Sequence, residues 1–288
     1  MKIPIAGNIN ALRVARRLDV TTSQLSSIFQ RLPSGLRINS GADDPAGIAI
    51  LSSLQADKMI ASVAFRNTSG GISVTNIAIE GINQVILILT RMQELAQQSA
   101  NGIYPNTQRS ALSAEFTLLA QESDRTSATT IFNNVTLLSN SAGTYIQVGL
   151  RGNASNNSIL IPQTSATLES LGIKDRFDQL TVSIIGSSAE VSQSLARNAL
   201  PILDAAIETL TQRRSVLAAA ENRLESAVNF LAASRENFAA AASRIGDADI
   251  AAESANLIRL QVLQNAQQAI LAQANQTPAL ALKLLQSN

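Results

Sequence analysis

Residues 201–245 read PILDAAIETLTQRRSVLAAAENRLESAVNFLAASRENFAAAASRI and carry the strongest structural pattern in the sequence. A seven-residue repeat of large apolar side chains predicts a helix that packs along one seam in a left-handed supercoil. At 1.5 Å per residue this helix would be about 65 Å long, which indicates a rod rather than a compact globule. The repeat falls on Leu203, Leu210, Leu217, Leu224, Leu231, Phe238 and Ile245. The positions three residues later are mostly small, namely Ala206, Ala220, Ala227, Ser234 and Ala241, with Arg213 as the exception.

Two further helical patterns lie earlier in the chain. Asp44-Pro45 combines an N-cap residue with a proline in the first helical turn, and apolar residues continue at helical spacing until Asn101-Gly102. A second pattern opens near Asn106-Thr107. We therefore expect the helices of 41–130 to pack against a returning helix over 187–243. The predicted fold class is mainly α, a long antiparallel helical rod that resembles a coiled coil.

The segment 131–186 lacks the helical spacing of apolar residues seen in the rest of the chain. Residues 144–148 and 180–185 are rich in β-branched and apolar residues and favour strands. Turns rich in Gly and Asn separate them, notably at 151–157. We expect this segment to form a small β-hairpin region attached to the rod.

The two ends of the chain are predicted to form a module of their own, from residues 1–40 and 244–288. The N-terminal segment is amphipathic, and the C-terminal helix, expected over about 249–275 and ending before Pro278, is apolar in most directions. A helix of that kind is normally buried on several sides, here by the other terminal helix and by neighbouring copies of the chain. The pattern therefore indicates polymerisation. The side chains expected to make this packing are Leu12, Leu18, Leu25, Leu257, Leu260, Leu263 and Ile270.

The amino-acid composition excludes most of the common catalytic and metal-binding sites. The 288 residues include neither Cys nor His, so thiolate or imidazole metal sites, Cys nucleophiles and Ser-His-Asp triads are excluded. Charged residues supply only 15% of the chain, which suits a surface covered by copies of itself. We therefore expect neither an enzyme nor a bound cofactor or metal.

Nucleic acid and membrane partners are not expected either. The net charge is +1 and aromatic residues make up 3%, so the chain offers neither a basic field nor stacking platforms. The longest strongly apolar run, 85–89, is far shorter than the roughly 20 residues of a membrane span. The first 20 residues are not typical of a secretory signal peptide, so if the chain is exported, we expect a route that does not read a cleaved signal.

Several long motifs resemble those of bacterial flagellins. Residues 32–50, LPSGLRINSGADDPAGIAI, are similar to the flagellin signature that follows the first terminal helix. Residues 243–285 are similar to the flagellin C-terminus almost end to end. LTRMQELAQQSANG at 89–102, IFNNVTLLS at 131–139 and IQVGLRGN at 146–153 follow in the family order. The resemblance covers nearly the whole chain and is to a short form that lacks large outer domains.

The resemblance implies a structural subunit that polymerises into the helical filament of the bacterial flagellum and serves motility. It also implies export by the flagellar apparatus, an export chaperone that binds the C-terminal helix, and contacts with filament-cap and hook-junction proteins. The alternative within the same superfamily is a hook–filament junction protein, which forms a short ring. In flagellins similar to this one, a motif contacts the vertebrate innate flagellin receptor, and its positions match Arg91, Glu94, Leu95 and Glu115.

Charged residues around the two connectors allow a more local hypothesis. We expect Arg37 to form an ion pair with Asp247 or Asp249 and so to join the connector strands. The pairs Asp43-Asp44 and Asp247/Asp249 are expected to cap helices and to form ion pairs between segments rather than to bind a cation.

Overall fold

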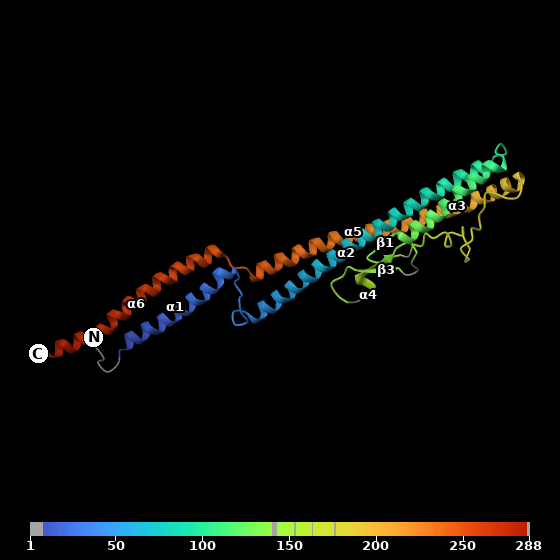
Figure 1. The fold of residues 1–288 in the computed structure, drawn as a ribbon. Helices are drawn as coiled ribbons and strands as arrows, with labels where there is room; N and C mark the ends of the chain where they lie inside the picture. The colour runs from blue at the N-terminus through green and yellow to red at the C-terminus, as the bar shows by residue number, and fades with distance from the viewer. Residues whose placement is uncertain (1–7, 140–142, 153, 163, 176, 287–288) are drawn as a thin grey trace. The chain divides into compact units, whose positions relative to one another are not determined.

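The structure is a computed structural model that describes residues 8–139, 143–152, 154–162, 164–175 and 177–286. The chain divides into two compact units (Figure 1). Unit 1 consists of Met1–Lys58 and Glu236–Asn288, the two ends of the chain, and unit 2 of Met59–Arg235. The division that we predicted at 40/41 and 243/244 stays a prediction. Residues 1–7 of the N-terminal segment lie outside the described residues.

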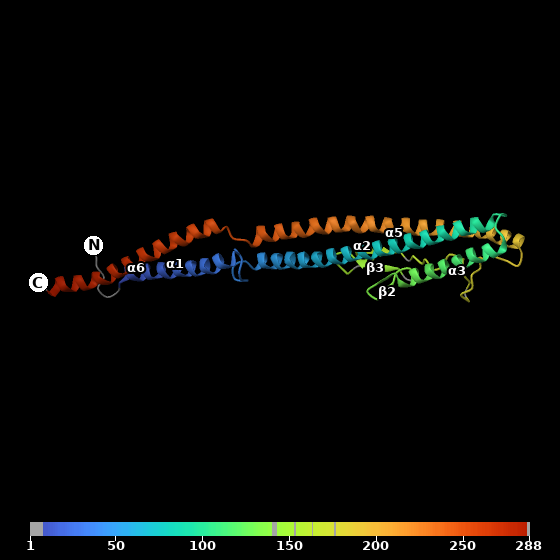
Figure 2. The same ribbon diagram turned by 45° about the horizontal axis from the view of Figure 1, so that its top comes forward.

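Unit 1 is built on the antiparallel pair of α1 (Ile9–Ser34) and α6 (Ile250–Gln286), which lie side by side in both views (Figures 1 and 2). The Asn8 side chain caps α1, because its Oδ1 accepts a hydrogen bond from the Ala11 amide at 3.0 Å. At the other end Gly35 adopts a left-handed conformation (φ 67°), and its N–H donates to the Arg31 carbonyl. The predicted pairing of terminal helices is confirmed.

The predicted end of the C-terminal helix is wrong, because α6 continues past Pro278 to Gln286. A proline inside a helix has no N–H to donate to the carbonyl four residues earlier, here that of Ala274. That carbonyl instead accepts a hydrogen bond from Asn8 Nδ2 at 2.7 Å. The break that proline normally causes is therefore compensated by the partner helix.

Unit 2 is an antiparallel helical bundle. Its helices are α3 (Asn106–Thr129) and the larger parts of α2 (Pro45–Ala100) and α5 (Ala189–Gly246). Gln93 Nε2 donates to Asp204 Oδ1 at 2.5 Å, and Arg214 Nη1 donates to Asn83 Oδ1 at 2.9 Å. Residue numbers thus rise along α2 as they fall along α5. The predicted long antiparallel helices are confirmed.

The seven-residue repeat of α5 forms the centre of the core of unit 2. Four of its leucines, Leu203, Leu210, Leu217 and Leu224, pack in one cluster with side chains of α2, α3 and the β region. Arg213, the exception to the small positions, extends out of the seam and donates to the Ser165 carbonyl and to Ser170 Oγ. Burial lowers the pKa of this guanidinium. The repeat leucines that are 1% exposed or less are Leu203, Leu210, Leu217, Leu224 and Leu231.

The β region consists of two small antiparallel pairs. β1 (Ile131–Phe132) pairs with β2 (Val135–Thr136), and β3 (Thr144–Gln147) pairs with β4 (Ser158–Ile161). Asn133 and Asn134 both have positive φ, as the tight turn between β1 and β2 requires. The short helix α4 (Ala154–Asn157) lies within the predicted turn at 151–157.

The strand predicted at 180–185 is wrong. Only an isolated bridge joins Leu180 to Lys174 there. Val182 and Ile184 of this segment are nevertheless buried in the core of unit 2. The Ile184 carbonyl, however, accepts its hydrogen bond from Ser99 Oγ of α2 at 2.7 Å. The segment packs its apolar side chains inward without a partner strand.

Candidate functional site

The core between α1 and α6 is thin. Leu25, Ile28 and Leu260 are buried at 3–5% exposure, and Leu32 and Leu257 pack beside them. Since a fully buried apolar side chain stabilises by only about 1.5–3 kcal/mol, so few of them hold the pair together weakly.

Large apolar side chains remain exposed on both terminal helices. Helices that expose this many large apolar side chains are candidates for contact with a partner. We name this set the terminal apolar surface; its exposed fractions run from 41% to 62%. It comprises Ile9, Leu12, Val20 and Phe29 of α1, and Ile250, Ile258, Val262, Leu263 and Ile270 of α6.

The seven side chains predicted to pack the terminal helices therefore fall into three groups. Leu25 and Leu260 are buried, and Leu18 and Leu257 are half-buried. The remaining three, Leu12, Leu263 and Ile270, are exposed and belong to the terminal apolar surface.

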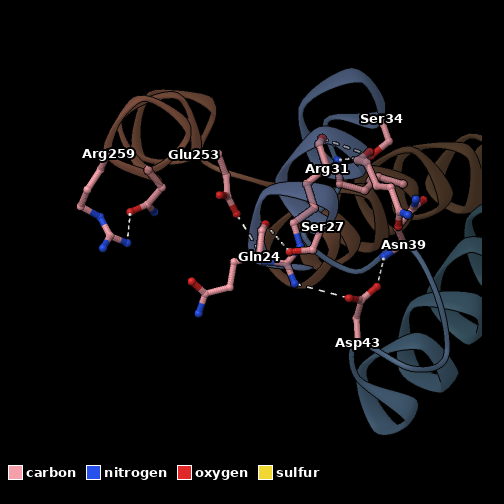
Figure 3. A network of polar contacts seen from close by, with 11 residues as sticks. Gln24, Ser27, Arg31, Ser34, Asn39, Asp43, Glu253 and Arg259 are labelled. Carbon is pink, nitrogen blue, oxygen red and sulfur yellow. Dashed lines mark hydrogen bonds and ion pairs between the residues drawn. The ribbon is translucent and has the colours of Figure 1, made fainter. Parts of the chain in front are cut away.

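Arg31 joins three segments of unit 1 (Figure 3). Its guanidinium on α1 lies 3.4 Å from Asp43 Oδ1 of the connector and 3.4 Å from Glu253 Oε1 of α6. Asp43 Oδ2 in turn accepts from the amides of Asn39 and Ser40 and from Ser40 Oγ. The network fixes the end of α1 to the connector and to the start of α6.

These donors lower the pKa of Asp43, chiefly through Ser40 and Asn39 and to a smaller extent through Arg31. A carboxyl whose pKa is lowered on folding stabilises the fold above its ordinary pKa of 3.8, and this contribution is lost as the pH falls through the folded value. We expect Ser40→Ala to raise the pKa of Asp43 toward 3.8. A carboxyl NMR titration from pH 6 to 2 measures the change. The exposed Ser52→Ala variant serves as the control, and an unchanged Asp43 midpoint in Ser40→Ala contradicts the assignment.

The two connectors pair through their backbones. Leu36 and Asp247 form a bridge, Arg37 N donates to the Gly246 carbonyl at 2.7 Å, and Ala248 N donates to the Gly35 carbonyl at 2.9 Å. The ion pair predicted for Arg37 is wrong, because its Nη2 donates to the Ile245 carbonyl at 2.7 Å instead. Over the described residues, no ion pair joins Arg37 to either aspartate.

The acidic pairs act locally, as expected. Asp44 Oδ1 accepts from the amides of Ala46 and Gly47 and caps α2. Asp249 Oδ1 likewise accepts from the first amides of α6. In the part of the chain that the structure describes, no group of three or more His, Cys, Asp or Glu residues could hold a metal ion.

A second polar cluster lies in unit 2. Arg91 of α2 donates through Nη2 to Glu115 Oε1 of α3 at 2.8 Å, and through Nη1 to Glu94 Oε2 at 2.8 Å. The two carboxylates raise the pKa of Arg91. All three side chains are about half exposed. Leu95 is different, since it has no exposed area and packs in the core.

Two family models match the chain, each on a terminal region. The bacterial flagellin N-terminal helical region matches residues 5–143, and the bacterial flagellin C-terminal helical region matches residues 200–285. The chain belongs to the bacterial flagellin family. It is a structural subunit of the flagellar filament, an extracellular polymer that flagellin subunits form with one another.

Known flagellins are similar over nearly their whole length. Flagellin of Halalkalibacterium halodurans is 34% identical over 279 residues, which cover 96% of this chain and 98% of that protein. Flagellin of Bacillus subtilis is 34% identical over 301 residues, with the same coverage of both chains. The flagellar filament 33 kDa core protein of Treponema phagedenis is 30% identical over 289 residues, again covering 96% and 98%. Relatives of similar length confirm a short flagellin.

The fold of this flagellin is also found in a solved structure described as a flagellar hook-associated protein from Vibrio parahaemolyticus. The TM-score is 0.59 at 12% sequence identity, with 71% of this chain and all of that chain covered. At this identity the likeness shows the fold alone.

One helix of the flagellin, Pro45–Ser99 within α2, is long and apolar enough to cross a membrane by length and composition alone. This differs from our expectation, which considered only the continuous run at 85–89. A third of the most apolar window is buried. Ile82, Val85 and Leu89 of this helix have no exposed area, so its apolar character contributes to the core of unit 2.

Sequence reasoning missed Arg109, a fully buried residue of the flagellin core. Its Nη1 donates to the Ala189 carbonyl at 2.5 Å and its Nη2 to the Asn101 carbonyl at 2.8 Å. One side chain thereby links α3 to the end of α2 and the start of α5. Only its place in the first turn of a predicted helix beside a Gly-containing turn could have suggested this role.

Proposed function

We propose that subunits polymerise by burying the terminal apolar surface against neighbouring copies. The supporting observation is that, up to residue 277, α1 and α6 expose nine large apolar side chains while their shared cluster has three buried ones. Burial of this surface between copies would stabilise both the contact and the thin helix pair itself. The mechanism is assembly rather than catalysis.

Seeded polymerisation of the purified chain, followed by electron microscopy, tests this function. Long filaments are the expected result. Short rings would favour the alternative, a hook–filament junction protein. Monomer that adds to no seed even at high protein concentration would contradict polymerisation of this chain alone.

A substitution within the terminal apolar surface should weaken assembly without affecting unit 2. Ile258 is 62% exposed, and burying such a side chain stabilises by about 1.5–3 kcal/mol, equivalent to tenfold or more in binding. We expect Ile258→Asn to raise the critical concentration for polymerisation at least about tenfold. Sedimentation of assembled filaments measures it.

The matched control is Ile258→Leu, which keeps the apolar area and should change the critical concentration by less than about threefold. Equal critical concentrations for Ile258→Asn and the unchanged chain would exclude this part of the surface from the contact.

The same resemblance supports several partners. We propose that the chain leaves the cell through the flagellar export apparatus without a cleaved signal peptide, and that an export chaperone binds α6, whose apolar side chains lie exposed. Filament-cap and hook-junction proteins are proposed to contact the terminal helices. We propose that residues 1–40 and 244–288 form the inner module of the filament. Residues 41–243 then form the outer rod, with its β region at 131–186.

We further propose that the Arg91 cluster is recognised by the vertebrate innate flagellin receptor. Arg91, Glu94 and Glu115 offer a fixed arrangement of one positive and two negative groups at the surface of unit 2. Leu95 has no exposed area, so its role in this proposal is to position the helix turn that carries Arg91 and Glu94.

Arg91→Ala should reduce receptor activation by monomeric protein about tenfold, because truncation removes a hydrogen-bonded charge and leaves two carboxylates repelling each other. A reporter-cell dose response measures the effect. Arg125→Ala is the matched control, since Arg125 makes a similar surface pair with Glu122. Identical dose responses for the Arg91 variant and the unchanged protein would count against recognition at this cluster.

A further inference from the structure

Asn8 uses both ends of its side-chain amide, one on each terminal helix. Its Oδ1 accepts from the Ala11 amide of α1 at 3.0 Å, and its Nδ2 donates to the Ala274 carbonyl of α6 at 2.7 Å. Ala274 is the residue whose helical hydrogen-bond donor Pro278 has removed, because proline carries no N–H. Within the body of α6, the carbonyl that Asn8 binds therefore differs from the carbonyls that keep their helical N–H donor.

The connectors and Arg31 hold the pair where α1 ends and α6 begins, whereas Asn8 lies at the opposite end of α1. Among the residues whose burial the structure describes, Leu25, Ile28 and Leu260 form the buried cluster between the helices, whereas α6 carries apolar side chains in most directions. A shift of α6 by one turn would replace buried apolar residues with others, so hydrophobic burial alone specifies the register poorly. A polar group that is satisfied in only one register discriminates among them.

We propose that Asn8 holds the register of α1 against α6 at the end of the pair far from the connectors, by pairing with the carbonyl that Pro278 leaves free. Aspartate would cap α1 equally well but has no hydrogen to donate, so only the amide meets both requirements. The consequence for assembly rests on the proposed function: a fixed register aligns the exposed side chains of both helices into one surface for neighbouring copies.

A double-mutant cycle on the full chain tests the proposal. Asn8→Asp keeps the cap and removes the donor, and we expect it to raise the critical concentration for polymerisation roughly tenfold. In the Pro278→Ala background residue 278 has an N–H for the Ala274 carbonyl, so the same Asn8→Asp change should have less than about a twofold effect. Asn10→Asp, at an exposed neighbouring position of α1, controls for the added charge.

Register is read independently of assembly by crosslinking Thr22→Cys to Gln264→Cys with a short bismaleimide, because the native side chains are in contact at 3.3 Å. The chain has no other cysteine. Crosslinking in free subunits should fall several-fold with Asn8→Asp and recover with Pro278→Ala. Equal effects of Asn8→Asp in both backgrounds, or none in either, would overturn the register role. If the proposed polymerisation surface is wrong, Ile258→Asn leaves the critical concentration unchanged, while the effects of Asn8→Asp and Pro278→Ala on crosslinking in free subunits remain as expected. The two failures are therefore distinguishable.

Discussion

Removal of about 40 residues from either end of the chain should abolish filament formation while unit 2 stays folded. Either truncation deletes one helix of the α1–α6 pair, so the remaining helix loses its partner and half of the terminal apolar surface. The core of unit 2 contains no residue from either deleted segment. Electron microscopy and sedimentation should detect no polymer. Circular dichroism should show that unit 2 of the truncated chain still unfolds in a cooperative transition, as it does in the full-length chain.

Seeds of full-length protein provide the control for this experiment. Truncated subunits should neither extend such seeds nor appear in the pellet, whereas full-length subunits extend them. Long filaments made from a truncated chain would refute assembly through the terminal helices.

Leu210→Ala should destabilise unit 2 by about 2–5 kcal/mol. Leu210 has no exposed area and belongs to the central core cluster of unit 2. Its truncation therefore removes apolar contacts and leaves a cavity that a closely packed seam cannot fill without moving neighbouring side chains. Denaturant unfolding of the purified monomer measures the loss.

Val216→Ala is the matched control on the same helix, because Val216 is 52% exposed in the single chain. We expect it to change the free energy of unfolding by no more than about 0.5 kcal/mol. Comparable losses for the two variants would mean that the seven-residue repeat does not form the core.

The helices were predictable because their pattern repeats many times. The leucine repeat of α5 is set by helical geometry alone, and the Asp44-Pro45 start of α2 is a local signal that needs no tertiary information. The 180–185 segment shows the limit of local pattern. Its composition favours a strand, but whether an extended segment joins a sheet depends on a partner strand, and here the Ile184 carbonyl accepts from the Ser99 hydroxyl of α2 instead.

The contacts between the two ends of the chain were harder to predict. Arg37 finds a backbone carbonyl rather than a carboxylate, and α6 passes Pro278 because Asn8 donates to Ala274 from more than 260 residues away. The distribution of burial could not be predicted either. Leu95 and Ile270 are similar in the sequence pattern, yet one has no exposed area and the other is half exposed in the single chain.

The terminal apolar surface also makes the strength of association between subunits depend on temperature. Burial of apolar area is driven almost entirely by entropy near 25 °C and carries a large negative heat-capacity change. The net charge of +1 leaves little overall electrostatic repulsion to overcome. Subunits should therefore associate more strongly as the solution warms from the cold toward room temperature, and chilled filaments should shed subunits from their ends. For a swimming cell, the length of this polymer would then depend on the temperature of the water around it as well as on the supply of subunits.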